Sequence, residues 1–219
     1  MPYSIMLDAG HGGRDPGAVY NGRQEKDDTL KLTLAVGQIL EDRGLDVEYT
    51  RTTDIYETPV QKAREANEAG VDYFVSIHRN STPESNKASG VESLVYDLSG
   101  IKYEMAQDIN EQLEAVGFVN LGVHARPDLA VLRRTNMPAV LVEVGFINQT
   151  QTTSSLMKTL TISHRPLREE SSIRWNMKGK QTMREKRRKV PGTGRGLPQP
   201  DLCPAADGGV DGPGYSGLY

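Results

Sequence analysis

Two histidines and two glutamates in this chain stand at positions suited to metal-dependent hydrolysis. His11 follows an apolar run and lies in the glycine-rich segment IMLDAGHGGRDPGA, residues 5–18, and His78 ends a second apolar run. Glu25 precedes a long helical pattern, whereas Glu143 lies inside an otherwise apolar run. Zinc binds neutral imidazoles and carboxylates, and a catalytic zinc site keeps one position for water. These residue types therefore indicate a candidate zinc site with hydrolytic chemistry.

The glycines around His11 are suited to a metal ligand at the end of a strand. They remove side chains that would block the approach to the imidazole, and they permit unusual backbone angles. Glu143 is informative for another reason, because a carboxylate in an apolar strand costs free energy unless it has a partner or a task.

Each of these residues, taken alone, also fits a structural role. A histidine at a strand end is commonly a hydrogen-bonded structural residue, and Glu25 alone fits a surface or helix-capping carboxylate. Glu143 alone fits an edge strand that faces water. His124 ranks below the other candidate ligands because it lies in a predicted loop, and His164, in the C-terminal part, receives no role. The order of the candidates along the chain carries more weight than any one of them.

The elements that must position these residues are short strands alternating with helices. Runs rich in Val, Ile, Leu and Tyr predict strands at 3–10, 45–51, 72–78, 90–96 and 139–146, with a weaker candidate at 129–133. Helical spacing predicts helices over 27–44, 57–70 and 100–117, each of which stops at a glycine. This alternation predicts a single-domain α/β sandwich, with helices on both faces of a largely parallel or mixed sheet of about six strands. Such sheets collect functional residues at the carboxyl ends of their strands.

Composition and charge exclude several classes of protein. The single cysteine, Cys203, excludes an internal disulfide framework and a cysteine-built zinc site. A net charge of −3 gives no reason to expect nucleic acid as a partner. The basic run 184–189 is an alternative nucleic-acid patch, and it would require salt-dependent binding to DNA. No apolar run approaches the length of a membrane span, and the N-terminus lacks the pattern of a signal peptide. We expect a monomer.

Residues 150–219 differ from the first 149 in composition. They form a basic stretch followed by a Pro/Gly-rich end, which is typical of a low-order tail because it buries too little apolar surface. A second hypothesis is a shifted reading frame, since residues 151–176 are compatible in a neighbouring frame with an amphipathic helix. Met157 and Trp175 have single codons, and each, with the residue that follows it, specifies glutamate in that frame. The coding DNA tests this hypothesis.

Five segments occur in an order that resembles one enzyme family. They are LDAGHGGRDPGA, QEKD, YTRTTD, KAREANEAGVDYFVSIHRNS and VLRRTNMPAVLVEVGFIN. Together they are similar to the zinc-dependent N-acetylmuramoyl-L-alanine amidases of the amidase_3 type, found in bacterial autolysins and phage endolysins. The resemblance covers about residues 3–148. It implies that His11, Glu25 and His78 are the zinc ligands and that Glu143 is the catalytic carboxylate.

The resemblance also implies a reaction and a place of action. A zinc-activated water would hydrolyse the amide between N-acetylmuramic acid and L-alanine in peptidoglycan, with Glu143 as general base and then acid. The enzyme would act at the bacterial cell wall, outside the cell or in the periplasm. Two features depart from the family pattern. Arg79 follows His78, at the expected rim of the site, where a long cation would reshape substrate access. The closing helix expected after residue 149 is absent.

Three other functions fit parts of the pattern. The HGG segment is similar to the oxyanion loop of esterases, but the chain has no Gly-x-Ser-x-Gly nucleophile motif. A zinc carboxypeptidase acting on cell-wall peptides would use the same ligands, and its products would distinguish it. A cell-wall-binding module without turnover has no need of Glu143.

Overall fold

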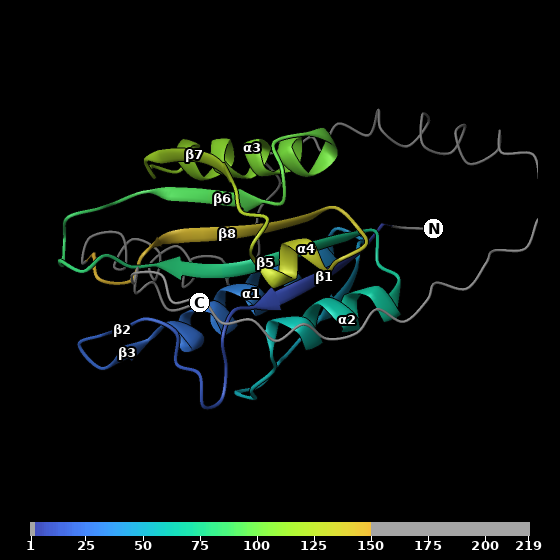
Figure 1. The fold of residues 1–219 in the computed structure, drawn as a ribbon, viewed down its shortest axis with the longest axis horizontal. Helices are drawn as coiled ribbons and strands as arrows, with labels where there is room; N and C mark the ends of the chain where they lie inside the picture. Colours follow the sequence, from blue (N-terminus) through green and yellow to red (C-terminus); the bar gives the residue numbers. More distant parts are fainter. Residues whose placement is uncertain (1–2, 150–219) are drawn as a thin grey trace, which may run out of the picture. The chain divides into compact units, whose positions relative to one another are not determined.

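The computed structural model describes residues 3–149 of the 219-residue chain. Strands and helices alternate along this part (Figure 1). In chain order they are β1 Ser4–Ala9, β2 Val19–Tyr20, β3 Arg23–Gln24, α1 Glu25–Asp42, β4 Asp46–Tyr49, α2 Pro59–Ala69, β5 Tyr73–Asn80, β6 Val91–Val95, α3 Gly100–Ala115, β7 Asn120–Ala125, α4 Ala130–Arg133 and β8 Ala139–Phe146. The predictions of a tail, of a shifted reading frame and of an absent closing helix lie outside the described residues.

A six-stranded sheet forms the centre of this fold, in the order β4-β1-β5-β8-β6-β7. All neighbouring pairs are parallel except β6 and β8, which are antiparallel. The largely parallel or mixed α/β sandwich expected from the sequence is therefore confirmed. The carboxyl ends of β1, β5 and β8 meet at one edge of the sheet, and this edge carries the candidate site.

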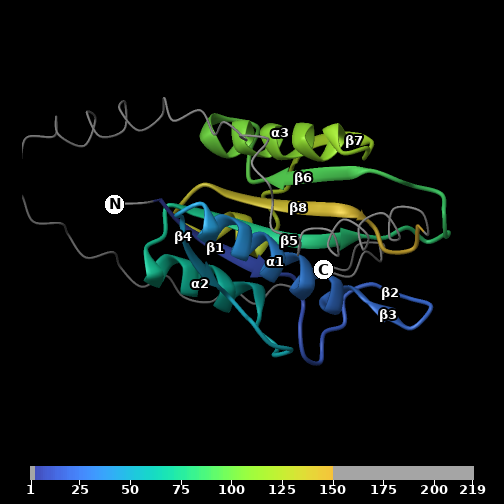
Figure 2. The ribbon, with the colours of Figure 1, turned by 180° about the vertical axis from the view of Figure 1, so that it is seen from behind.

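Helices cover both faces of the sheet, as expected. Figures 1 and 2, which view the fold from opposite sides, show α4 in front of the sheet in one view and α1 in front in the other. On one face, Leu32 of α1 and Met105 of α3 pack in a core cluster with Ile77 of β5. On the other face, the cluster contains apolar side chains from α2, α4 and alternate strand residues, including Phe74. Alternation along β5 then places His78 on the α2/α4 face, since it lies four residues beyond Phe74.

The structure corrects two expectations about the weaker elements. Residues 129–133 are not a strand: most of this run is the short helix α4, whose Val131 and Leu132 are buried in the core. A short apolar run does not distinguish a buried strand from one turn of helix. The sixth strand is instead β7. None of its residues is fully buried, so its sequence does not need the apolar run by which a strand is recognised. His124 consequently lies in a strand, not in a loop.

Within residues 3–149, no helix has both the length and the apolar character needed to cross a bilayer.

Candidate metal centre

His11, Glu25 and His78 come together at the carboxyl edge of the sheet. One potential ligand atom from each residue lies within 4.8 Å of the others. His11 follows β1, and His78 lies near the end of β5, two strands that pair directly. Glu25 was expected in the loop before the first long helix, and it is in fact the first residue of α1. The side chains are buried, with 7% of His11, 5% of Glu25 and 11% of His78 exposed.

Two glycines leave the space in which these side chains meet. A Cβ on Gly10 would lie 2.5 to 2.7 Å from three atoms of the His78 ring. A Cβ on Gly17 would lie 2.6 Å from both Glu25 Oε2 and His11 Cδ2. His11 itself has a φ of 60°, which a residue with a side chain rarely adopts and which is common at functional sites. The glycine-rich segment therefore serves to pack ligand side chains against bare backbone.

The Glu25 carboxylate is the centre of the cluster. Its Oε1 lies 3.1 Å from His78 Nδ1 and accepts a hydrogen bond from the Arg79 amide at 2.9 Å. Its Oε2 lies 3.2 Å from His11 Nε2 and accepts a hydrogen bond from the Ala18 amide at 2.9 Å. Burial opposes ionisation of Glu25, but the contacts with the two histidines outweigh it and lower its pKa strongly. The carboxylate is therefore charged at neutral pH.

The cluster fits a metal ion better than it fits a closed hydrogen-bond network. Although His11 Nε2 is buried and near Glu25, it makes no hydrogen bond within the described part of the chain. Buried polar atoms are rarely left in this state. On its other side, His11 Nδ1 lies 2.9 Å from Asp15 Oδ2. A carboxylate that holds one imidazole N–H directs the lone pair of the other nitrogen toward a metal.

The same contacts couple metal binding to protons. Burial disfavours the charged form of His11, but Glu25 and Asp15 outweigh burial and raise the pKa of the imidazole. Because a metal binds the neutral imidazole, protons would compete with a metal ion for His11.

Beneath the cluster, buried charges fix the backbone that leads to His11. Asp8 accepts hydrogen bonds from Thr50 Oγ1 at 2.7 Å and Ser76 Oγ at 2.5 Å, and Lys62 Nζ lies 2.7 Å from its Oδ1. Burial raises the pKa of Asp8, but Lys62 and the hydrogen bonds outweigh it and lower the pKa. Lys62 Nζ also donates to the Ala9 carbonyl at 2.7 Å. Asp8 and Lys62 were not among the candidates predicted from sequence, although Asp8 is a charged residue in an apolar strand, as Glu143 is.

Arg51 supports the same backbone segment. Its Nε donates to the Ala9 carbonyl at 3.0 Å, and its Nη2 donates to the Gly10 carbonyl at 2.9 Å. The Gly10 carbonyl also accepts a hydrogen bond from Thr29 Oγ1 at 2.7 Å. The segment between β1 and His11 is therefore held from two directions.

The sequence suggested that Arg79 lies at the rim of the site, but the structure places it in the interior. Its side chain is fully buried, and its Nη1 lies 2.6 Å from Asp28 Oδ2. Its Nη2 donates to the Phe146 carbonyl at 3.0 Å. Asp28 also binds Arg23, which lies in the β2–β3 hairpin, at 2.7 Å. Arg79 thus joins α1, β5 and the end of β8, and its side chain is buried away from the surface.

Glu143 is buried, with 1% of its surface exposed, and lies directly opposite His78 in the register of β5 and β8. Neighbouring strands are about 4.8 Å apart, and opposed residues share a face of the sheet. On this face of the sheet, the side chain of Glu143 therefore lies next to that of His78, a member of the cluster. His124 is separate from the cluster: its side chain is 52% exposed, and its Nε2 lies 3.4 Å from Glu92 Oε2.

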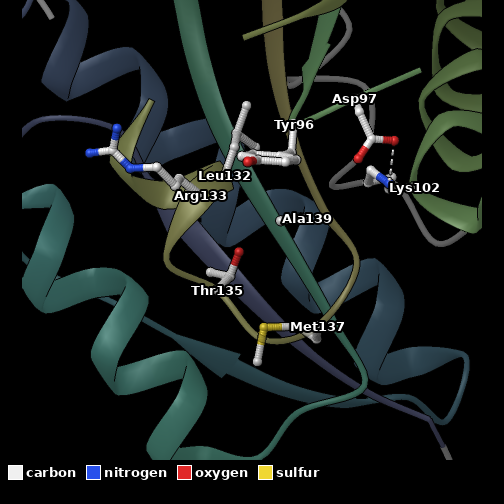
Figure 3. Close-up of a pocket in the computed structure, with 8 residues that line it drawn as sticks. All are labelled: Tyr96, Asp97, Lys102, Leu132, Arg133, Thr135, Met137 and Ala139. Carbon is white, nitrogen blue, oxygen red and sulfur yellow. Dashed lines mark ion pairs between the residues drawn. The ribbon is translucent and has the colours of Figure 1, made fainter. Parts of the chain in front are cut away.

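A cavity of about 270 Å³ lies at the other edge of the sheet (Figure 3). Its lining includes Ala139, the first residue of β8, and an ion pair of 2.8 Å between Asp97 and Lys102. None of the four predicted site residues lines it.

Comparisons with known proteins agree on one family. The family model described as N-acetylmuramoyl-L-alanine amidase (Amidase_3) matches residues 5–161. An endolysin of Bacillus phage SPP1 is 39% identical over 166 residues, which cover 72% of this chain and 60% of that protein. A sporulation-specific N-acetylmuramoyl-L-alanine amidase of Bacillus subtilis is 38% identical over 169 residues, which cover 73% of this chain and 64% of that protein. The chain thus spans less than two thirds of these relatives.

Solved structures show the same fold. An N-acetylmuramoyl-L-alanine amidase from Clostridium difficile 630 matches with a TM-score of 0.69 and 28% identity, over 74% of this chain and 90% of that chain. The catalytic domain of CwlV, an amidase of the same name from Bacillus (Paenibacillus) polymyxa var. colistinus, matches with a TM-score of 0.67 and 29% identity, over the same shares.

Proposed function

Because the chain belongs to the amidase_3 family of N-acetylmuramoyl-L-alanine amidases, we propose that it hydrolyses the amide bond between N-acetylmuramic acid and L-alanine in peptidoglycan. The enzyme would act at the bacterial cell wall, outside the cell or in the periplasm, and as a monomer. The observation that carries this proposal is the buried cluster of His11, Glu25 and His78, in which His11 Nε2 has no hydrogen bond among the described residues.

His11, Glu25 and His78 would hold a zinc ion. Two imidazoles and one carboxylate form a donor set that zinc uses in catalytic sites. Bound there, zinc supplies a Lewis acid that polarises the amide carbonyl and brings the pKa of water to about 7. Asp15 keeps the His11 imidazole oriented, and the amides of Ala18 and Arg79 hold the Glu25 carboxylate.

Glu143 would move the proton. Its place opposite His78 in the sheet register supports this role, since a substrate bound at the cluster would have its reacting atoms next to the Glu143 carboxylate. It would accept a proton from the attacking water and deliver it to the leaving nitrogen of L-alanine. General acid–base help of this kind contributes about 10² to 10⁴-fold to the rate.

The test combines metal analysis with digestion of purified peptidoglycan. We expect about one zinc per chain and the appearance of free L-alanine amino termini, with no release of single amino acids. Release of D-alanine instead would indicate the carboxypeptidase, and binding without any product would indicate a wall-binding module.

The variant Glu143→Gln separates chemistry from metal binding. We expect it to keep its zinc and to lose turnover, because an amide cannot accept the proton from water. Near-native turnover by this variant would reject Glu143 as the base. A matched control is Glu48→Gln, since Glu48 is an exposed glutamate on β4, on the other side of β1 and β5 in the sheet.

A further inference from the structure

Polar side chains continue past Glu143 along the same row of the sheet. Glu143 of β8 is opposite His78 of β5 on one side and opposite Glu92 of β6 on the other. Because directly opposed residues share a face, these three side chains form one row across three strands. With strands about 4.8 Å apart, the backbone of Glu92 lies roughly 10 Å from that of His78.

Glu92 is held in place from two sides and still reaches solvent. Its Oε1 accepts a hydrogen bond from Asn80 Nδ2 at 2.5 Å, and its Oε2 lies 3.4 Å from His124 Nε2. Asn80 is two residues beyond His78 in β5, so its amide reaches Glu92 across β8. The Glu92 side chain is 22% exposed, and that of His124 is 52% exposed. A fixed, accessible carboxylate is suited to bind a hydrogen-bond donor.

The order of groups along the row gives the direction of the substrate, and this step rests on the proposed function. The metal cluster lies on the β1 and β5 side of Glu143, whereas Glu92 and His124 lie on the β6 and β7 side. If Glu143 delivers the proton to the leaving nitrogen, that nitrogen lies on the Glu143 side of the cluster. The peptide attached to it then extends over β6. An extended peptide advances about 3.3 Å per residue, so Glu92 is within one or two residues of the cleaved bond.

We propose that Glu92, positioned by Asn80 and His124, binds the stem peptide on the leaving-group side. Its carboxylate accepts a hydrogen bond from a peptide N–H in the first two residues of the stem. This contact is made in the ground state and the transition state alike, because no charge develops at that distance from the reacting carbonyl. It therefore contributes to KM and not to kcat.

The decisive comparison is between full-length wild type and Glu92→Ala. We expect KM for soluble muramoyl peptide to rise about tenfold in the variant, with kcat within about twofold and zinc content unchanged. Affinity for the product-like peptide L-alanyl-γ-D-glutamyl-L-lysine, measured by calorimetry, should fall by the same factor, which corresponds to about 1.4 kcal/mol. Glu92→Gln, which keeps one acceptor oxygen, should recover part of the affinity, and Glu48→Ala should match wild type.

Two outcomes would overturn the inference. One is unchanged peptide affinity and KM in Glu92→Ala. The other is a fall in kcat and zinc content at constant KM, which would show that Glu92 only supports the fold of the site. The proposed function is tested separately, by turnover of peptidoglycan by the wild type. The calorimetric comparison measures peptide binding and therefore tests the role of Glu92 even if no turnover is found.

Discussion

Replacing Gly10 by alanine tests whether bare backbone beneath His78 is what builds the metal centre. The added Cβ would lie 2.5 Å from His78 Cε1, so that atom must retreat beyond 3.0 Å, and to 3.4 Å for an ordinary contact, a displacement of about 0.5 to 0.9 Å. The backbone cannot yield easily, because the Gly10 carbonyl accepts bonds from Thr29 and Arg51, and its amide donates to the Ile77 carbonyl at 3.0 Å. The imidazole ring must therefore move.

A displacement of this size is large for a metal ligand, since coordination distances hold within about 0.2 Å. We expect the zinc affinity of Gly10→Ala to fall by about 100-fold. This is the upper end of the loss in metal affinity that follows when the surroundings of a metal ligand are changed. Turnover of peptidoglycan at limiting zinc should fall in parallel. The assay is competition with a chelating dye, with circular dichroism to confirm the fold.

Gly22→Ala provides the matched control for Gly10→Ala. Gly22 has a φ of 78°, and a Cβ there would meet no atom within 4 Å. Alanine at this position should cost about 1–2 kcal/mol of stability through backbone strain and leave zinc affinity unchanged. Zinc affinity of Gly10→Ala within about threefold of wild type would refute the argument that space beneath the ring sets the site.

Three further predictions concern the charges around the site. Removal of zinc by a chelator should abolish turnover of peptidoglycan, and added zinc should restore it; turnover that persists in the zinc-free chain would contradict the metal assignment. Arg79→Leu removes one of the two cationic partners of the buried Asp28 carboxylate and leaves only Arg23. It should cost about 3 kcal/mol in urea unfolding, the lower end of the cost of breaking a buried ion pair, because Asp28 stays partly compensated. Lys62→Met tests the buried charge of Asp8, whose pKa in the folded protein lies below the usual 3.8. In the wild type the ionised Asp8 therefore stabilises the fold above about pH 4, and this stability is lost as pH falls through the folded pKa. Without Lys62, burial is opposed only by the remaining hydrogen bonds and weaker charges, so the pKa of Asp8 should rise relative to wild type. The variant should therefore gain less stability than the wild type as pH rises through about 4, measured by unfolding at several pH values.

The sequence was sufficient for the fold class and for the meeting of the candidate ligands, because both follow from local pattern. Apolar runs separated by helical stretches predict parallel strands, and parallel strands bring their carboxyl ends to one edge. His11 and His78 end two such runs, so their proximity followed from topology. β7 was missed because an edge strand need not be apolar, and Asn120–Ala125 has no fully buried residue.

The buried interactions that hold the site in place could not be predicted from sequence, and Arg79 shows why. It follows a histidine that ends an apolar run, so the chain was expected to leave the sheet there and expose the arginine. β5 instead continues to Asn80, and successive side chains in a strand point to opposite faces. His78 therefore faces the side of α2 and α4, whereas Arg79 faces α1, where Asp28 neutralises it. Whether a residue that follows an apolar run is buried or exposed depends on where the strand stops pairing with its neighbour. For β5 that neighbour is β8, some sixty residues later in the chain, so the local sequence does not reveal it.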